Sequence, residues 1–435
     1  MGSARAWAGL DLGTSGARLC LLNAAGEILH EDTRALPPSR TEGRCSEQSP
    51  AHWWRVVREL LECVPAEARI EAIAVDGTSG SVLAIDPCGE PLSDALMYDD
   101  ARAVAEAARI ARVAPPESPA NSVHSGLARA LWLAERLPPG MEARYVNQAD
   151  WIAGKLSGRH GFSDETNALK MGYDAMRRTW PRWIPPLLPE TALPRVRPVG
   201  TPIGNRPDGA RVCLGATDST ASVLAACDGI PEVGAGISVL GSTLVVKLVC
   251  KRPLFDATRG VYSHRVGDRW LVGGASNSGG AVLATFFTRE QIEQLSRRID
   301  PTTPSPLDYY PLRRPGERFP RNAPSLAPRL SPRPGDDVAF LHGMLEGIAR
   351  IEAEAYALLA RATGTPLKRV VSIGGGAANP TWRAIRERRL GVSVERARHR
   401  QAARGAALIA LRQDRSAYSF HGEKGNGRRS VSKPR

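Results

Sequence analysis

Two stretches of the chain decide the fold prediction: residues 9–22 read GLDLGTSGARLCLL, and residues 236–249 read GISVLGSTLVVKLV. Each begins as an apolar strand, passes through Leu-Gly and two hydroxyl residues, and continues as a second apolar strand, which is the pattern of a β-hairpin. One such match carries little weight. Two matches this far apart in the chain indicate a duplicated unit, with one copy in each of two lobes.

The residues around the first hairpin predict a lobe that mixes strands and helices. Its expected strands are residues 7–13, 17–23, 28–35 and 70–76. Its expected helices, which carry apolar side chains at helical spacing, are residues 50–64, 101–113 and 125–136.

A stretch rich in Gly, Pro and Asp at residues 200–209 is the expected lobe boundary, which gives an N-terminal lobe of residues 1–208 and a C-terminal lobe of residues 209–411. Ten prolines between residues 301 and 334 predict an extended surface segment. Its expected packing anchors are Tyr309, Tyr310 and Phe319. Whether this segment wraps the surface passively or acts as a lid stays open, and we favour the first.

Two helix starts can be predicted beyond this segment. Asp336 or Asp337 can cap a long amphipathic helix that ends at Gly364. Further on, Asn379 and Pro380 suit the N-cap and first position of another helix.

Composition excludes several classes of protein. The chain has 435 residues, which suggests two to three domains, and 42% hydrophobic with 24% charged residues is ordinary for a globular protein. The apolar runs are too short to cross a bilayer, and the N-terminus lacks a secretory signal. The seven cysteines are scattered, without C-x-x-C spacing, which fits a reducing compartment and predicts a cytoplasmic protein.

The net charge of +13 is concentrated toward the C-terminus, where residues 412–435 hold seven Lys/Arg against two Asp/Glu. Such a tail suits either nucleic-acid binding or a solvated, disordered terminus. We favour the second, and the body lacks a basic run with interleaved aromatic residues. We therefore expect neither nucleic acid nor membrane as a partner, and the oligomeric state stays open.

Familiar nucleotide and hydrolase motifs are absent from the sequence: there is no G-x-x-x-x-G-K-[ST], no G-x-G-x-x-G after a strand, no H-E-x-x-H and no G-x-S-x-G at the relevant turns. What recurs is a strand that ends in a Gly-Ser/Thr turn, often with an aspartate beside it. The four sites are Asp11 to Ser15, Asp76 to Ser79, Gly215 to Ser219 and Leu240 to Thr243.

These turns carry the residue types that phosphate chemistry needs. Glycine lets the backbone approach a phosphate closely, and Ser or Thr adds hydroxyl donors. A neighbouring Asp can hold Mg²⁺ or accept a proton from an attacking hydroxyl. A single turn of this kind is more often a plain hairpin connection, but four of them, together with Gly374-Gly375-Gly376 after a strand, favour a polyphosphate site.

The residues quoted so far resemble the FGGY carbohydrate kinase family, within the superfamily of actin-like ATPases, and the resemblance covers about residues 7–411. The sequence motifs are most similar to those of the compact D-ribulokinase-like, or xylulose-kinase-like, branch. The matching pieces are GLDLGTSGARLCLLN, DGTSGSVLAIDPCGEPLSDALMYDDAR, QADWIAGKLSG, SDETNALKMGYD, LGATDSTASVLAA, SVLGSTLVVKL, LDYYPLRRPGERFP and SIGGGAANPTWRAI.

The resemblance implies an α/β fold of two ribonuclease-H-like lobes with nucleotide and sugar between them. It implies that Asp218 is the catalytic base and also contacts the sugar, and that Asp11 positions Mg²⁺. The other residues that it places on ATP are Thr14, Ser15, Gly241, Ser242, Thr243, Gly374, Gly375, Gly376 and Asn379. Those that it places on the sugar are Asp76, Gly77, Thr78, Ser79 and Asp100.

The expected activity is therefore transfer of the γ-phosphate of ATP to a ketopentose, with D-ribulose as first choice. D-Xylulose and other ketoses or polyols are the alternatives. The fold alone also permits an actin- or chaperone-like nucleotide switch without a small substrate. A pseudokinase that only binds sugar is the third reading, and the intact Asp11 and Asp218 argue against it.

Overall fold

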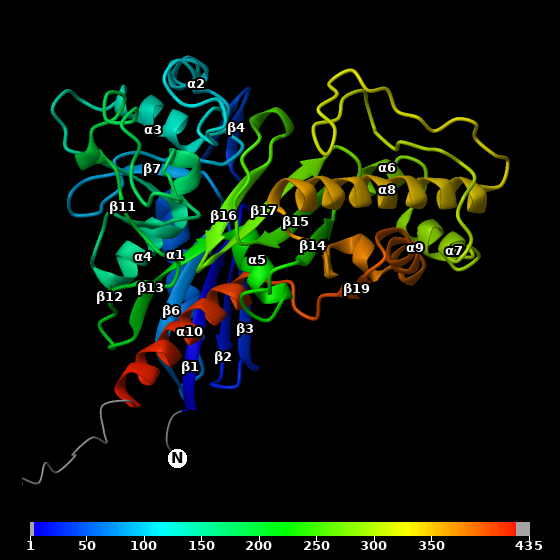
Figure 1. The fold of residues 1–435 in the computed structure, drawn as a ribbon. Coiled ribbons are helices and arrows are strands. Elements are labelled where there is room, and N and C mark those ends of the chain that lie inside the picture. The colour runs from blue at the N-terminus through cyan, green and yellow to red at the C-terminus, as the bar shows by residue number, and fades with distance from the viewer. Residues whose placement is uncertain (1–3, 423–435) are drawn as a thin grey trace, which may run out of the picture.

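The computed structural model describes residues 4–422, with side chains through residue 413, and each of its two lobes is built on a six-stranded sheet (Figure 1). In neighbour order, the N-terminal sheet contains β12 (Pro202–Asn205), β13 (Arg211–Thr217), β6 (Ala68–Gly77), β1 (Ala4–Leu12), β2 (Gly16–Leu22) and β3 (Ile28–Ala35). The C-terminal sheet contains β16 (Tyr262–Val266), β17 (Arg269–Ser276), β15 (Leu244–Cys250), β14 (Ala235–Leu240), β18 (Arg369–Ile373) and β19 (Ser393–Arg396).

The two sheets repeat one unit, as the duplicated hairpins predict. In the first, β1 pairs antiparallel with β2 and parallel with β6. In the second, β14 pairs antiparallel with β15 and parallel with β18. The chain therefore has the two-lobed α/β fold of the actin-like ATPases, and the expected fold class is confirmed.

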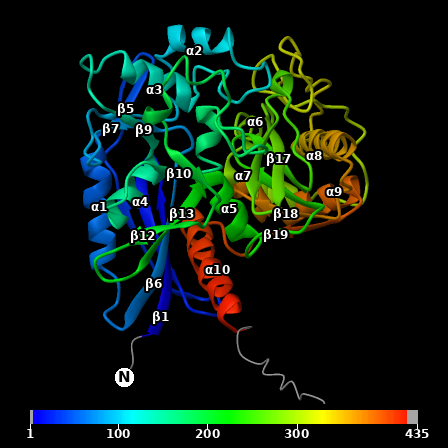
Figure 2. The same ribbon diagram turned by 60° about the vertical axis from the view of Figure 1, so that its left-hand side comes forward.

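Helices cover both faces of each sheet. On the N-terminal sheet, α1 (Pro50–Glu62) and α4 (Gln148–Ser157) share one core with the strands. On its other face, α5 (Asp218–Ala226) and α10 (Ala402–Gly422) lie between the two sheets in a second core (Figure 2). The outer face of the C-terminal sheet packs against α6 (Gly280–Leu283), α7 (Arg289–Ser296), α8 (Asp337–Thr363) and α9 (Pro380–Leu390).

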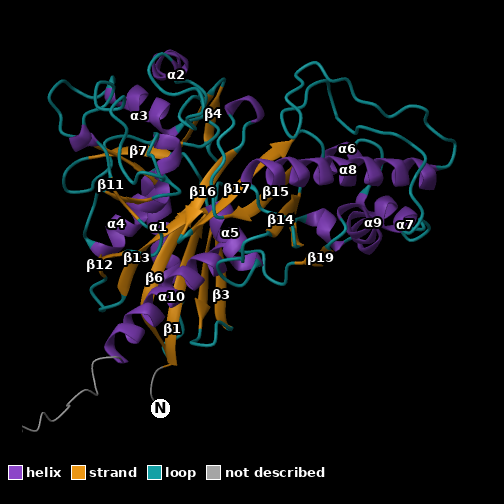
Figure 3. Ribbon diagram, viewed as in Figure 1, coloured by secondary structure: helices purple, strands orange, loops and turns teal. Residues whose placement is uncertain are grey.

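A smaller unit stands on the N-terminal lobe, at the upper left of Figure 3. Its sheet contains β4 (Arg40–Glu42), β5 (Cys45–Gln48), β8 (Ala95–Leu96), β7 (Val82–Ile85) and β9 (Arg144–Asn147). Beside it lie α2 (Val104–Ala111), α3 (Gly126–Ala134) and the strand pair β10 (Phe162–Asp164) and β11 (Arg195–Arg197). Single 3₁₀ turns are found at Ala168–Met171, Glu190–Ala192, Ala257–Arg259 and Gly375–Ala378.

The structure moves the expected lobe boundary. Position 208/209 falls between β12 and β13, which are neighbours in the N-terminal sheet. The Gly- and Pro-rich stretch there is a hairpin turn, in which Gly209 has a φ of 89° and its N–H donates to the Arg206 carbonyl at 2.9 Å. The chain crosses to the C-terminal sheet only after α5.

The expectations for the C-terminal part of the chain have different outcomes. Helix α10 continues to Gly422, so the start of the segment predicted as a disordered tail, residues 412–422, is helical. Residues 423–435 lie outside the described residues. The proline-rich segment has no regular element, and its expected anchors Tyr309, Tyr310 and Phe319 are buried. Among the described residues, no helix is long and apolar enough to cross a membrane.

Candidate active site

The glycine turns singled out in the sequence follow strands that are neighbours within each sheet. Asp11 is the partner of Asp76 in the pairing of β1 with β6, and Thr217 of β13 is the partner of Gly77. In the other lobe Val239 is the partner of Ile373, so the turns that follow them are neighbours. Between the sheets lies a cleft of about 510 Å³, lined by Asp11, Gly13, Arg18, Asp218, Ser219, Ser222, Val223, Val239, Val245, Lys247, Ile373, Arg400, Gln401 and Ala402.

The turn after β1 is held from two sides. The Gly13 N–H donates to the Gly16 carbonyl at 3.0 Å, which closes the turn that contains Thr14 and Ser15. From outside, Gln48 Nε2 donates to the Thr14 carbonyl at 2.7 Å, and Trp53 Nε1 fixes Gln48 by donating to its Oε1 at 2.8 Å. The buried tryptophan of α1 thus positions the turn expected to hold phosphate.

Asp11 is buried at the end of β1 and forms an ion pair with Arg18, whose Nη1 lies 2.8 Å from Oδ2. Sequence reasoning missed Arg18. The hairpin pattern could have found it, because residues 11 and 18 are direct cross-strand partners. Arg18 also lines the cleft, so a cation accompanies Asp11 where phosphate is expected.

The turn after β6 leaves polar atoms without protein partners. Asp76 is fully buried, and within the described chain neither of its carboxylate oxygens has a hydrogen-bond partner. Burial, and then the neighbouring Asp11, raise the pKa of Asp76 well above its usual range. The Ser79 hydroxyl is likewise buried and unpartnered there, whereas Thr78 is fixed by Gln148, which accepts from its N–H at 3.0 Å and from its hydroxyl at 2.8 Å.

The structure gives Asp100 a structural role rather than a place in the cleft. Its buried carboxylate accepts hydrogen bonds from the Ser46 N–H at 2.7 Å and from Arg102 Nε at 2.8 Å. The buried Arg129 donates to the carbonyls of Asp100 and Gly80, at 2.6 and 2.7 Å, and so ties this loop to the turn after β6. Asp100 is thus held by protein partners and does not line the cleft, so we expect it to act on the site through the backbone.

Asp218 opens α5 and faces the cleft, where the Ser219 N–H donates to its Oδ1 at 2.6 Å. Burial raises the pKa of Asp218, while the Ser219 N–H, Lys170 and Lys247 oppose that rise. Its position is set by the preceding residue: the Thr217 N–H donates at 2.9 Å to the Thr166 hydroxyl, which in turn donates to Asp164 Oδ1 at 2.5 Å. The SDETN stretch therefore anchors the start of α5.

Two lysines stand close to Asp218. Lys247 on β15 is buried and donates from Nζ to the Ser219 hydroxyl at 3.3 Å, and burial lowers its pKa to about 8. Lys170 donates to the Ser79 carbonyl at 3.1 Å, and burial lowers its pKa as well. Neither has an ion-pair partner within 4.0 Å in the described residues, and Lys247 lines the cleft, so its charge is available to an anion there.

On the other lobe, Gly241, Ser242 and Thr243 form the tight turn between β14 and β15. The Gly280 and Ala281 N–H groups donate to the Gly241 and Ser242 carbonyls, at 2.9 and 3.1 Å. The proline-rich segment supports this region through Glu317, which accepts from the Ser276 hydroxyl at 2.6 Å and from the Asn277 N–H at 2.8 Å. The proline-rich segment therefore supports the site, which could not be predicted from its proline content.

The triple-glycine turn follows β18. Gly374 has a φ of 93°, and a Cβ there would lie 2.5 Å from the Leu240 carbonyl oxygen, so only glycine fits. A Cβ at Gly376 would likewise lie too close to the Trp382 ring, whereas a Cβ at Gly375 would have open space. Asn379 caps α9 by accepting from the Trp382 N–H at 3.0 Å, and its Nδ2 donates to the Ser296 hydroxyl at 2.8 Å. Its amide is thus already used within the protein.

Paired hairpins from two related lobes, with an aspartate at the start of a helix between them, define the actin-like class of fold. The model of the FGGY carbohydrate kinase N-terminal domain matches residues 6–231, and that of the C-terminal domain matches residues 236–413. The chain therefore belongs to the FGGY family of carbohydrate kinases.

Individual relatives agree with this membership. The chain is 26% identical to a xylulose kinase of Bacillus subtilis, over 92% of this chain and 87% of that protein. It is 23% identical to a gluconokinase of the same organism, over 87% and 81%. Among solved structures, a xyloylose kinase from Brucella ovis superposes with a TM-score of 0.83 at 22% identity, covering 96% of this chain and 92% of that one. Plasmodium falciparum glycerol kinase with ADP gives a TM-score of 0.83 at 15% identity, covering 96% and 91%.

Proposed function

We propose that this ATP-dependent sugar kinase acts on a ketopentose, with D-ribulose as the first candidate. The observation that supports the assignment is the position of Asp218, which faces one cleft together with Asp11 and the ends of β14, β15 and β18. The acceptor specificity rests on the sequence resemblance to the D-ribulokinase-like branch. D-Xylulose is the second candidate, favoured by several relatives described as xylulose kinases.

In the proposed reaction, Asp218 takes the proton of the acceptor hydroxyl as that oxygen attacks the γ-phosphorus of ATP. A new P–O bond forms to the sugar, the bond to the bridging oxygen breaks, and ADP leaves. The raised pKa of Asp218 makes it a better proton acceptor than an exposed aspartate. Lys247 and Arg18 would offset charge on the transferred group, since phosphoryl transfer depends mainly on positioning and electrostatics.

Magnesium fits the residues at this site. The described residues contain no cluster of three Asp, Glu, His or Cys side chains that could hold a metal by themselves. Mg²⁺ in phosphotransferases needs only one or two carboxylates besides water and phosphate oxygens. We propose that Asp11 holds it, with the unpartnered oxygens of Asp76 adjacent. When bound, Mg²⁺ would neutralise phosphate charge.

The turn after β6 is the proposed sugar site. Buried polar atoms without partners are rare and costly, and sugar hydroxyls can supply the missing hydrogen bonds. Asp76 and Ser79 offer such atoms in the described part of the chain. A sugar that lacked the matching hydroxyl would leave them unpaired, which costs about 1–3 kcal/mol for each group.

A coupled kinase assay across pentuloses, hexuloses and polyols tests the proposal, with the phosphorylated product identified by mass. We expect ADP release only with ketopentoses, a mass gain of one phosphoryl group, and no product from Asp218→Asn. Equal rates for D-ribulose and D-xylulose would mean that the enzyme is a general ketopentose kinase without preference for D-ribulose. ATP hydrolysis that no sugar stimulates would contradict the proposal.

A further inference from the structure

The segment between β19 and α10, residues 397–401, connects the two lobes. β19 belongs to the C-terminal sheet, whereas α10 packs on β1, β6 and α5 of the N-terminal lobe. The segment carries two arginines, Arg398 and Arg400, with His399 between them. Any ligand that it binds is therefore held where the lobes are joined.

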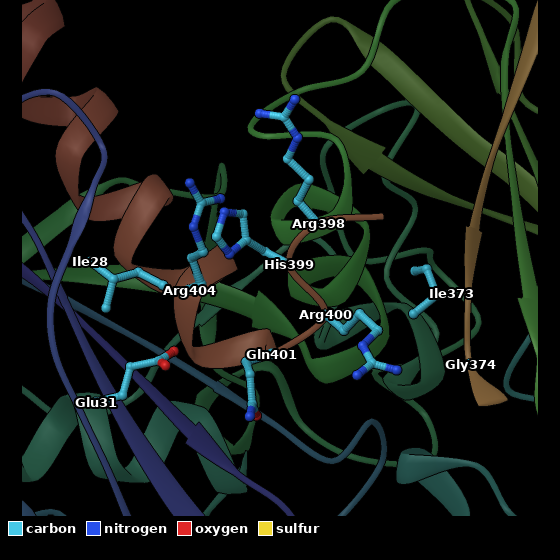
Figure 4. Close-up of a pocket in the computed structure, with 9 residues that line it drawn as sticks. All are labelled: Ile28, Glu31, Ile373, Gly374, Arg398, His399, Arg400, Gln401 and Arg404. Atoms are coloured by element: carbon cyan, nitrogen blue, oxygen red, sulfur yellow. The ribbon is translucent and has the colours of Figure 1, made fainter. Parts of the chain in front are cut away.

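Arg400 borders two adjoining hollows. One is the cleft that contains Asp11, Gly13 and Asp218. The other, of about 480 Å³, reaches Ile373 and Gly374 at the start of the triple-glycine turn. Figure 4 shows the Arg400 side chain directed toward Ile373 and Gly374, while Arg398 extends from the same segment in another direction. The Arg400 guanidinium thus lies between the site expected for phosphate and the site expected for adenosine.

The charge of Arg400 is not used by the protein. Within the part of the chain that the structure describes, its side chain has no hydrogen bond or ion pair. The nearby Arg404 differs, because its guanidinium donates to Asp228 Oδ1 at 2.6 Å and to the Gly26 carbonyl at 3.1 Å. Of the three arginines that line the second hollow, only Arg400 also borders the catalytic cleft.

We propose that Arg400 binds the phosphate chain of the nucleotide, on the side that approaches Gly374. Guanidinium groups suit phosphate because they donate two parallel hydrogen bonds and stay charged. A nucleotide that runs from the turn after β18 to the turn after β1 must pass this side chain. Binding would then tie the connecting segment to the ligand, so that occupancy of the site restrains the relative motion of the lobes.

This inference rests on the proposed function, and a binding experiment tests the role of Arg400 separately from the kinase assignment. Calorimetric titration of the full chain with ADP and with adenosine needs no sugar and no turnover. We expect Arg400→Gln to weaken ADP binding about tenfold, and adenosine binding by less than about twofold. Arg400→Lys should recover part of the loss. Arg396→Gln is the matched control, since Arg396 is exposed on β19 and lines neither hollow, and it should bind ADP as the wild type does.

The salt dependence gives a second readout. ADP binding to the wild type should weaken more steeply with rising KCl than binding to Arg400→Gln, because one charge contact is screened. Equal ADP affinity in wild type and Arg400→Gln would overturn the proposal and leave the kinase assignment standing. Equal losses for ADP and adenosine would overturn it in favour of a structural role. Failure of the wild type to bind ADP would overturn the proposed function as well.

Discussion

Asp11 and Asp76 are direct partners in the parallel pairing of β1 with β6, so two carboxylates stand side by side at the edge of the N-terminal sheet. Their surroundings differ. Asp11 has an ion pair with Arg18, whereas Asp76 has no partner in the described chain. Such a pair is unfavourable in the absence of ligand, because one of the two groups must hold a proton or a cation.

We predict that Asp76→Asn stabilises the ligand-free protein in the presence of a chelator. The pKa of Asp76 is raised in the native state, so folding holds a proton that the unfolded chain releases above about pH 4. The wild type therefore loses stability as pH rises from that point, and the variant does not. Thermal melts should show a larger advantage of Asp76→Asn at pH 8 than at pH 5. The KM for the ketopentose should rise at least about tenfold, with little change in the KM for ATP.

Asp100→Asn is the matched contrast, since Asp100 is equally buried but fully partnered. Loss of the carboxylate charge leaves Arg102 with a weaker hydrogen-bond acceptor. We therefore expect the free energy of unfolding to fall by about 2–3 kcal/mol. The KM for sugar should change little in the folded fraction. A lower melting temperature for Asp76→Asn than for the wild type would contradict our description of the unpartnered carboxylate.

We predict that Asp218→Asn lowers kcat by roughly 10²–10⁴-fold, because general-base catalysis contributes about that much. The amide is isosteric and keeps the acceptor for the Ser219 N–H, so nucleotide affinity should stay within about threefold of the wild type. Single-turnover phosphoryl transfer and ADP titration separate the two effects. The exposed Asp268→Asn is the surface control and should behave as the wild type does. Turnover that survives in Asp218→Asn would remove this residue from the mechanism.

The strand ends could be predicted from sequence because their signals are local. An apolar strand followed by Gly-Thr-Ser needs no distant partner to be recognised, and the hairpins at Gly13 and Gly241 form as expected. The partners that fix these turns could not be predicted in the same way. Gln48 holds the Thr14 carbonyl, and Gln148 holds Thr78, across 34 and 70 residues of chain. Contacts of that kind depend on how the elements pack.

The lobe boundary was misplaced and the protein partners of Asp100 were not foreseen, for related reasons. Glycine and proline mark both linkers and hairpin turns, and only the pairing of β13 with β6 shows that residues 206–209 form a turn inside a sheet. The family resemblance placed Asp100 on the sugar, whereas in the structure its carboxylate accepts a hydrogen bond from a neighbouring, mostly buried arginine. Arg102 is that neighbour, and it lies two residues away, where sequence reasoning gave it no role.

We predict that Lys247→Met raises stability and lowers activity together. Burial lowers the native pKa of Lys247 to about 8, against roughly 10.4 in an unfolded chain, so the charged side chain destabilises the fold at pH 7. Wild-type stability recovers as pH rises from about 8 to 10, where the unfolded state binds more protons. The variant should therefore be more stable by roughly 3 kcal/mol at pH 7 and by less at pH 10. At pH 7 its kcat should fall at least about tenfold.

Lys251→Met serves as the control, because Lys251 follows β15 directly and is exposed. It should change stability by less than about 0.5 kcal/mol and leave kcat unaltered. Thermal melts at several pH values and initial rates at pH 7 check both variants. A Lys247→Met protein that is more stable and fully active would show that this lysine has no part in phosphoryl transfer.

The triple-glycine turn allows a comparison of two adjacent glycines. Gly374→Ala forces a Cβ against the Leu240 carbonyl at a φ of 93°, so the turn must shift away from the end of β14. Gly375→Ala meets nothing within 4 Å. We predict that the first variant loses at least about tenfold in affinity for ADP and about 1–3 kcal/mol in stability, and that the second keeps both. Calorimetric titration with ADP and thermal melts measure the two effects. If both variants bound ADP equally well, the turn after β18 would not form part of the nucleotide site.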